Sequence, residues 1–424
     1  MHTSFSPPSF PRLSAARISS RKVIRAGAAA AVAVGTTGVL ALSSAPAIAA
    51  PAACGHPTVT KQFFGRAFDS YFGKKLPVFR YTLSNCHRMQ VRIITYGATT
   101  QSIVVPGRTG KLANIALGFR TLREYVTKDS PPQGGGTYFG ETIGRYGNRI
   151  AKGTFVLNGV RYHLPINNNG NSLHGGTIGF GNHVYRSHIV HTPGSAGVAL
   201  TIVSPDGDMG YPGRLTLTVT YALNNSNDLA IHYHATTSKD TVFNPTNHSY
   251  FNMAGEASGT VYGQEMIINA NRYTPTDTTQ IPTGRLAPVA GTPFDFRTAH
   301  TIGSRINVAN RQLLIGQGYD HNWVLNRGGA KPGQLTFAAA AWDPRSGREI
   351  KVFTDQPGVQ FYSGNFLTGT LVGISNHIYR QGAGFTFETQ HYPNSPNQPN
   401  FPTTTLRKGQ VYNSTTIFAF GIHH

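Results

Sequence analysis

The sequence of 424 residues contains little charge, few acidic residues and almost no cysteine. Charged residues make up 13% of the chain, with 17 Asp and Glu against 37 Lys and Arg, and there are two cysteines. Long stretches rich in Glu, Lys and Leu are missing, which excludes a helix bundle or an α-solenoid. The hydrophobic content of 39% and the aromatic content of 11% are too high for a disordered chain, so we expect a large core.

The basic excess lacks the clustering that nucleic-acid binding requires. The formal net charge is +20, of which five charges lie in the first 50 residues, and the remaining Lys and Arg are dispersed. Clusters rarely exceed two residues, as in Lys74-Lys75 and Arg407-Lys408. We therefore expect no nucleic-acid partner, and an association with an anionic cell envelope fits the dispersed charge better.

The first 50 residues predict a cleaved export signal. Five basic residues between Arg12 and Arg25 precede an apolar run over 26–42, and the small residues Ala47 and Ala49 suit a signal peptidase. The run is short and weakly hydrophobic beside the ~20 residues of a bilayer span, and no other such run occurs. The sequence thus predicts a signal peptide over 1–50, a domain over 51–424 and a secreted, extracellular protein without a membrane span; the export route stays open.

Both cysteines, Cys54 and Cys86, follow the predicted cleavage site. An exported chain meets an oxidising compartment, where such a pair can form a disulfide. The sequence leaves open whether they pair. A lipoprotein acylation site at Cys54 is a weaker alternative, because Pro51 stands where a Leu-type residue is expected.

From Thr58 onward, the sequence consists of short alternating runs separated by turns, as in antiparallel strands. Hairpins are predicted over 154–163 around Asn158-Gly159, over 215–235 around a polar turn, and over 334–354 around 343–347. No internal repeat and no linker divides residues 60–424. The sequence therefore predicts an all-β fold, a large single-domain antiparallel β-sandwich.

Several common catalytic and metal-binding motifs are absent. There is no Gly-x-x-x-x-Gly-Lys-Ser/Thr phosphate loop, no Gly-x-Ser-x-Gly elbow and no His-Glu-x-x-His helix. His232 and His234 share a strand face, as two zinc ligands would, but nothing else at metal-ligand spacing accompanies them. No metal site is expected.

Other segments gather side chains that bind hydroxyl groups or transfer protons. In the segment 144–150, adjacent Asn148 and Arg149 suit the clamping of vicinal hydroxyls, and the flanking glycines let the backbone approach a ligand. A carboxylate among aromatic residues, as at Asp320, is typical of sugar recognition. Glu388 follows an apolar strand in a chain with 17 acids, where such a group is either costly or functional.

Three more candidates come from segments of similar composition. We expect the segment 244–252 to be one strand with His248, Tyr250 and Asn252 on the same face, a polar strip that seldom belongs to a core. His174 stands beside two glycines, and Gln360 lies in a Gly-bounded strand. Taken singly, each of these segments is also compatible with a turn or a structural role.

Together, the segments resemble one family, the aldose 1-epimerases or galactose mutarotases, over residues 58–424 and in the family's order. The resemblance implies a galactose mutarotase-like supersandwich and a cofactor-independent isomerase that interconverts the α and β anomers of free aldohexoses such as galactose and glucose. It also implies a monosaccharide as the partner and the need for no metal, nucleotide or redox cofactor. The residues that match the motifs imply two catalytic groups, His248 as acid and Glu388 as base, and six substrate-binding groups: Asn148, Arg149, His174, Tyr250, Asp320 and Gln360.

Departures from the family pattern are few, and alternatives stay open. Asn394 stands where the family often has Asp, Gly147 stands where Ala is usual, and the long export segment is unusual. An epimerase for modified or phosphorylated sugars and a secreted carbohydrate-binding protein without catalysis are the alternatives. The preferred aldose and the oligomeric state do not follow from the sequence.

Overall fold

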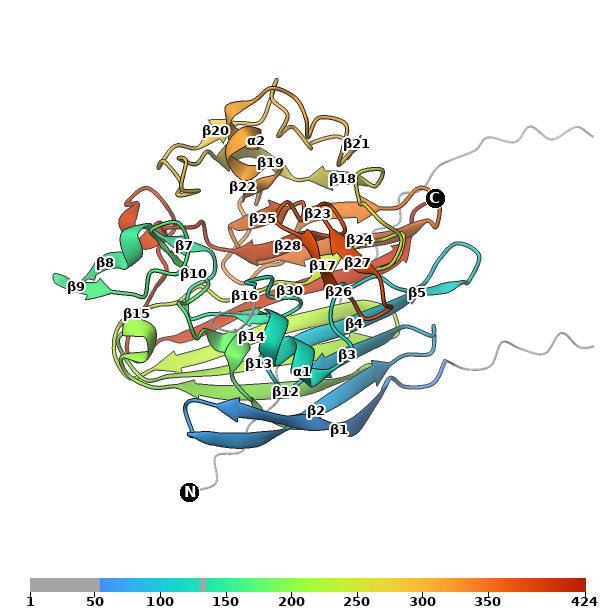
Figure 1. Cartoon of the computed structure of the whole chain (residues 1–424), viewed down its shortest axis with the longest axis horizontal. Coiled ribbons are helices and arrows are strands. Elements are labelled where there is room, and N and C mark those ends of the chain that lie inside the picture. Colours follow the sequence, from blue (N-terminus) through green and yellow to red (C-terminus); the bar gives the residue numbers. More distant parts are fainter. Residues whose placement is uncertain (1–53, 130–134) are drawn as a thin grey trace, which may run out of the picture. The chain divides into compact units, whose positions relative to one another are not determined.

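Antiparallel β-sheets build most of the part of the protein that the structure describes (Figure 1). The structure is a computed structural model that describes residues 54–129 and 135–424. The signal peptide predicted for residues 1–50 lies outside the described residues. Gly55–His424 form one compact unit, and no helix described in it has the length and hydropathy needed to cross a bilayer.

Three large sheets make up this unit. The nine-stranded sheet has the order β11 (Arg186–Thr192), β12 (Ser195–Ser204), β13 (Leu215–Asn224), β14 (Asp228–Thr237), β30 (Val411–Ile422), β24 (Arg348–Thr354), β23 (Thr336–Trp342), β18 (Glu265–Ile268) and β21 (His300–Thr301). The six-stranded sheet has the order β17 (Tyr250–Phe251), β28 (Phe385–Gln390), β25 (Gly358–Tyr362), β22 (Asp320–Leu325), β19 (Ala270–Thr274) and β20 (Ala287–Pro288). The five-stranded sheet contains β1 (Thr58–Asp69), β2 (Lys74–Ser84), β3 (Gln90–Ile94), β4 (Thr99–Pro106) and β5 (Leu112–Asn114).

Short elements connect the sheets. The paired strands among them are β6 (Thr142–Ile143) with β16 (Thr246–Asn247), β7 (Arg149–Ile150) with β10 (Ser172–Leu173), β8 (Thr154–Leu157) with β9 (Val160–His163), β15 (Thr241–Val242) with β29 (Thr405–Leu406), and β26 (Thr368–Val372) with β27 (Ile378–Arg380). The described α-helices are α1 (Leu122–Glu124) and α2 (Arg311–Gly316), and five single helical turns complete the elements: Tyr125–Asp129, Ala151–Gly153, Phe180–Asn182, Asp208–Gly210 and Ser395–Asn397.

One hydrophobic core joins the three sheets. Its buried side chains come from the nine-stranded sheet, such as Leu217 and Phe418, from the six-stranded sheet, such as Phe361 and Phe387, and from the five-stranded sheet, such as Val91. Alternating strand residues supply these side chains, so each sheet turns its apolar face toward the core. This packing is the predicted β-sandwich.

The three predicted hairpins are present. β8 and β9 pair around Asn158 and Gly159, both of which have positive φ, as a two-residue hairpin turn requires. β13 pairs with β14, and β23 pairs with β24. The third hairpin begins at Thr336 rather than at position 334, so only its first two residues were placed wrongly.

The single strand expected over 244–252 is wrong. The segment forms two short strands, β16 and β17, which pair with β6 and β28 in different sheets, and His248 lies between them. The backbone of His248 instead bonds to the neighbouring loop: its N–H donates to Glu141 O at 2.9 Å, and its carbonyl accepts from Gly140 N at 3.0 Å. Asn252 does not share the site of His248, because its amide donates to the carbonyls of Gly259 and Ala383.

Candidate active site

One face of the six-stranded sheet is polar, although every residue of its strand β28 is buried. Phe385 and Phe387 of β28 enter the core, so the residues that alternate with them, including Glu388, face the opposite side. Glu388 lies opposite Gln360 of β25, which in turn lies opposite Asn322 of β22. The register thus places a carboxyl group and two amides in one row across three strands.

A cavity of about 230 Å³ lies where this polar face meets the connecting loops. Seven of the eight predicted site residues line it: Asn148, Arg149, His174, His248, Tyr250, Asp320 and Glu388. The eighth, Gln360, does not line the cavity but donates from Nε2 to Oδ1 of Asp320 at 2.7 Å. The structure therefore brings all the predicted residues to one place.

The two predicted catalytic groups face each other in this cavity. Nε2 of His248 lies 3.5 Å from Oε1 of Glu388, and both side chains are buried. The hydroxyl of Thr386 donates to the same Oε1 at 2.9 Å. Oε2 of Glu388 has no hydrogen-bond partner among the residues that the structure describes, so one carboxyl oxygen remains to accept a proton.

Burial shifts the pKa values of the two groups in opposite directions. It raises the pKa of Glu388 to about 8 and lowers the pKa of His248 to about 3. At neutral pH the pair thus holds one proton, and burial favours its position on Glu388. The sequence led us to expect a protonated imidazole and an ionised carboxyl group at neutral pH. For the resting pair this expectation is wrong, because burial disfavours both charges. The expected arrangement holds the same one proton and forms when that proton moves from Glu388 to His248.

His174 forms one wall of the cavity in a defined tautomer. Its Nδ1 accepts from the backbone N–H of Asn148 at 3.2 Å, and β7 pairs with β10 so that Leu173 is opposite Arg149. Burial, with smaller contributions from His248 and Arg149, holds the pKa of His174 well below its usual range, so the ring is neutral. Since Nδ1 must be the acceptor, the ring proton is on Nε2, and His174 is a hydrogen-bond donor there.

Three of these groups are close enough together for a metal site. The nearest ligand atoms of His174, His248 and Glu388 lie within 4.8 Å of one another. The tautomer of His174 does not suit ligation, however, because Nε2 carries a proton while Nδ1 faces the Asn148 N–H. The arrangement is better suited to donating and accepting protons than to holding a cation.

Arg149 and Asp320 form the polar end of the cavity. Their closest atoms, a guanidinium nitrogen and Oδ2, are 3.9 Å apart, and both side chains are buried. Burial raises the pKa of Asp320, while the charge of Arg149 and the hydrogen bonds from Gln360 and Gln280 favour the ionised form and limit the rise. A buried guanidinium, a carboxylate and amides together can donate to and accept from several hydroxyl groups.

Sequence reasoning missed several lining residues. Tyr138 places its ring 4.7 Å from the ring of His174, Tyr362 and Phe366 stack at 5.9 Å, and Gln280 contacts both Arg149 and Asp320. The glycines before Tyr138 and the aromatic pair after Gln360 were usable signals. Gln280 lies in a polar turn without any motif, so the sequence carried no signal for it.

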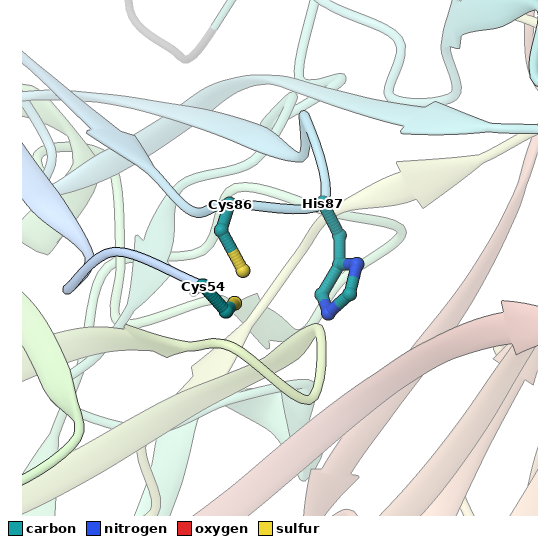
Figure 2. Close-up of side chains that lie close together, drawn as sticks. All are labelled: Cys54, Cys86 and His87. Atoms are coloured by element: carbon teal, nitrogen blue, oxygen red, sulfur yellow. The ribbon is translucent and has the colours of Figure 1, made fainter. Parts of the chain in front are cut away.

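Neither cysteine is free, and both are disulfide-bonded, so Cys54 and Cys86 form the one disulfide that two cysteines allow. Figure 2 shows their side chains close together beside His87. All three residues are exposed, and none of them lines the cavity. Because both thiols are in the disulfide, this cluster is not a metal site.

An all-β sandwich whose polar cavity holds an imidazole–carboxyl pair and a guanidinium–carboxylate pair has the features of a carbohydrate-active enzyme. Residues 80–419 match the family described as aldose 1-epimerase, and the chain belongs to this family. The resemblance and the fold class inferred from the sequence are confirmed.

Similar proteins cover most of the chain. Galactose mutarotase of Sus scrofa is 43% identical over 335 residues, which cover 79% of this chain and 92% of that protein. Aldose 1-epimerase of Escherichia coli (strain K12) is 37% identical over 341 residues, which cover 80% and 94%. The crystal structure of galactose 1-epimerase from Lactobacillus acidophilus NCFM superposes with a TM-score of 0.73 at 30% identity, covering 87% of this chain and 99% of that chain.

Proposed function

We propose that this protein is a mutarotase that interconverts the α and β anomers of free aldohexoses such as galactose and glucose. Membership of the aldose 1-epimerase family supports the assignment. The observation that carries it is the buried pair of His248 and Glu388, 3.5 Å apart, in the same cavity as Arg149 and Asp320. An acid–base pair beside groups that bind hydroxyls is what this reaction needs.

The reaction opens the sugar ring, rotates about the C1–C2 bond and closes the ring again. In the opening step, Glu388 removes the proton from the C1 hydroxyl, the C1–O5 bond breaks, and His248 delivers a proton to the ring oxygen. Ring closure reverses both transfers, so protons balance over the cycle and no electrons are exchanged. Each correctly placed acid or base typically contributes ~10²-fold or more in rate.

The remaining polar groups bind the sugar. Asn148, Arg149, His174 and Asp320 bind hydroxyl groups, Gln360 acts through Asp320, and Tyr250 lines the cavity beside His248 with ring centroids 5.2 Å apart. His174 donates from Nε2, as its tautomer dictates. These contacts hold the open-chain aldehyde in place until the ring closes.

The alternative of a phosphorylated substrate has less support. Among the described residues that line the cavity, Arg149 is the one Lys or Arg side chain, and it already donates to Asn168 and Gln280. A phosphate group carries about two negative charges and is usually bound by several cations or backbone N–H groups. A non-catalytic binding protein is disfavoured, because it would have no need of the buried pair.

We also propose that the protein is exported, with cleavage near Pro51. The basic and apolar composition of residues 1–50 supports this, and a disulfide is compatible with an oxidising compartment. The dispersed basic surface suits a weak association with an anionic cell envelope. Fractionation of producing cells with N-terminal sequencing tests the proposal: activity confined to lysates, or an intact Met1 terminus, contradicts it.

Polarimetry tests the mutarotase assignment. Freshly dissolved α-D-galactose and α-D-glucose are followed with purified protein, with the Glu388→Gln variant and with buffer alone. We expect faster decay of rotation with the wild type alone, while calorimetry shows that the variant still binds sugar. Decay at the buffer rate for both sugars contradicts the assignment, and a fully active variant removes Glu388 from its role.

A further inference from the structure

Gln280 is brought into the cavity by a tight turn between β19 and β20. The carboxylate of Asp277 organises this turn: its Oδ1 accepts from the backbone N–H groups of Thr279 at 2.8 Å and Ile281 at 3.1 Å. Gln280 itself has a φ of +64°, and its side chain is 6% exposed. Glutamine seldom adopts this left-handed conformation, so the hydrogen bonds of the surrounding turn must hold Gln280 in place.

The amide of Gln280 lies between the two charged groups at the polar end of the cavity. Its Oε1 accepts from the guanidinium of Arg149, and its Nε2 donates to Oδ2 of Asp320 at 2.9 Å. Arg149 and Asp320 are 3.9 Å apart and make no direct hydrogen bond. The orientation of the amide is unambiguous, because a guanidinium only donates and a carboxylate only accepts.

The two charged groups also have other partners, which leave defined bonding capacity for a ligand. Nε of Arg149 donates to Asn168 at 3.0 Å, and Oδ1 of Asp320 accepts from Gln360 at 2.7 Å. The Gln280 amide retains one N–H, and the Asp320 carboxylate retains lone pairs on both oxygens. A sugar hydroxyl at this end thus meets an acceptor and a donor whose relative positions Gln280 sets.

We propose that Gln280 is the positioning residue of this substrate-binding end and determines which hydroxyl configuration it accepts. It fixes the Arg149 guanidinium relative to the Asp320 carboxylate and contributes its second amide N–H to a sugar hydroxyl. The inference rests on the proposed mutarotase function. Because these groups bind hydroxyls that do not react, their contribution is the same in the ground state and the transition state, and they affect KM rather than kcat.

Three variants of the full chain test the proposal. Gln280→Leu removes both hydrogen bonds at nearly constant volume, and Gln280→Asn keeps the amide but shortens its reach by one methylene. Gln317→Leu is the matched control, because Gln317 also has a positive φ of 53° but is exposed and does not line the cavity. Steady-state polarimetry gives kcat and KM for galactose and for glucose, which differ in the configuration of one hydroxyl.

We expect both Gln280 variants to raise KM by about ten- to a hundredfold, as the loss of hydrogen bonds to buried charged groups predicts. We also expect kcat to change little, the ratio of the two KM values to shift, and Gln317→Leu to match the wild type. Unchanged KM, or a fall in kcat and melting temperature at constant KM, overturns the proposal, since the role of Gln280 would then be nil or only structural.

A separate outcome concerns the mutarotase assignment itself. If the wild type does not accelerate the reaction of either sugar, calorimetric titration of galactose into the wild type and Gln280→Leu replaces kinetics. Weaker binding by the variant then supports the positioning role although the function has failed. Equal binding, or no binding by either protein, overturns it.

Discussion

His248 and Glu388 act as one titrating unit, because their side chains are buried and their facing atoms are 3.5 Å apart. Between the pKa of about 3 for His248 and the pKa of about 8 for Glu388, the unit holds one proton. The reactive arrangement, with the proton on the imidazole, differs from the favoured one only in the position of that proton. The ratio of these two arrangements is therefore independent of pH across this range.

This coupling predicts the pH dependence of catalysis. We expect kcat/KM to be level from about pH 4 to 7 and to decline above about 8, where the pair loses its last proton. Groups with the ordinary pKa values of 4.5 for Glu and 6.5 for His would give a decline already above about 6.5. Polarimetry between pH 4 and 9, corrected for the buffer rate, distinguishes the coupled pair from groups with ordinary pKa values. A decline centred near pH 6.5 contradicts the coupled pair.

Replacement of the same carboxyl group is expected to stabilise the fold. The pKa of Glu388 is raised in the folded protein, because the buried site favours the protonated carboxyl group. The contribution of this group to the free energy of unfolding is therefore greatest below about pH 4.5 and is lost as the pH rises through about 8. Glu388→Gln removes the buried charge. We therefore expect the variant to gain roughly 3–5 kcal/mol in free energy of unfolding over the wild type at pH 9, beyond any difference between the two proteins at pH 4. Denaturant unfolding at the two pH values measures the difference.

Glu124→Gln is the control for this measurement. Partial burial raises the pKa of Glu124, but hydrogen bonds from Thr121 outweigh this effect and lower it. Its charge is therefore favourable, and the substitution should leave stability unchanged or slightly lower at pH 9. A Glu388→Gln variant that is not stabilised at pH 9 would contradict the burial of a charge at this position.

At the scale of the elements, the register of β22, β25 and β28 fixes the spacing of the site. Gly358 begins β25 next to the row of Asn322, Gln360 and Glu388. A Cβ atom on Gly358 would lie 2.4 Å from Oδ1 of Asn322 and 3.0 Å from the ring of Tyr392. Gly358→Ala must displace the Asn322 side chain and the Tyr392 ring, so we expect a loss of about 1–3 kcal/mol in stability and a lower kcat.

A second glycine provides the control for this clash. Gly421, near the end of β30, has no atom within 4 Å of the position that an added Cβ would occupy, so Gly421→Ala should be neutral or slightly stabilising with normal activity. Thermal melting and polarimetry of both variants measure the effects. Equal behaviour of the two variants would show that Asn322 and Tyr392 make room for the extra atom without disturbing the site.

The strands and the catalytic candidates were predictable from sequence because they depend on local patterns. Period-two alternation and turn residues predicted the hairpins, and short motifs identified Arg149, His248 and Glu388. Gln280 could not be found in this way, since its role arises from a turn that meets Arg149 and Asp320 only in the folded chain. The break at His248 was missed because the same alternation fits one strand or two strands that pair in different sheets.

At the scale of the whole molecule, the disulfide is expected to contribute stability without taking part in catalysis. Cys54 and Cys86 are exposed and lie outside the cavity lining (Figure 2). A crosslink that closes the chain between positions 54 and 86 reduces the entropy of the unfolded state, and such loops contribute about 3–4 kcal/mol. The double substitution Cys54→Ser and Cys86→Ser should therefore lower the melting temperature by a few degrees and leave kcat and KM unchanged.

Reduction of the wild type provides an independent comparison for this variant. Dithiothreitol should lower the melting temperature of the wild type toward that of the double variant, whose own melting should not respond to the reductant. Because the disulfide acts mainly on the unfolded state, neither treatment should change the geometry of the cavity. A fall in kcat on reduction would instead mean that the crosslink holds the active site in its working arrangement, which its position outside the lining argues against.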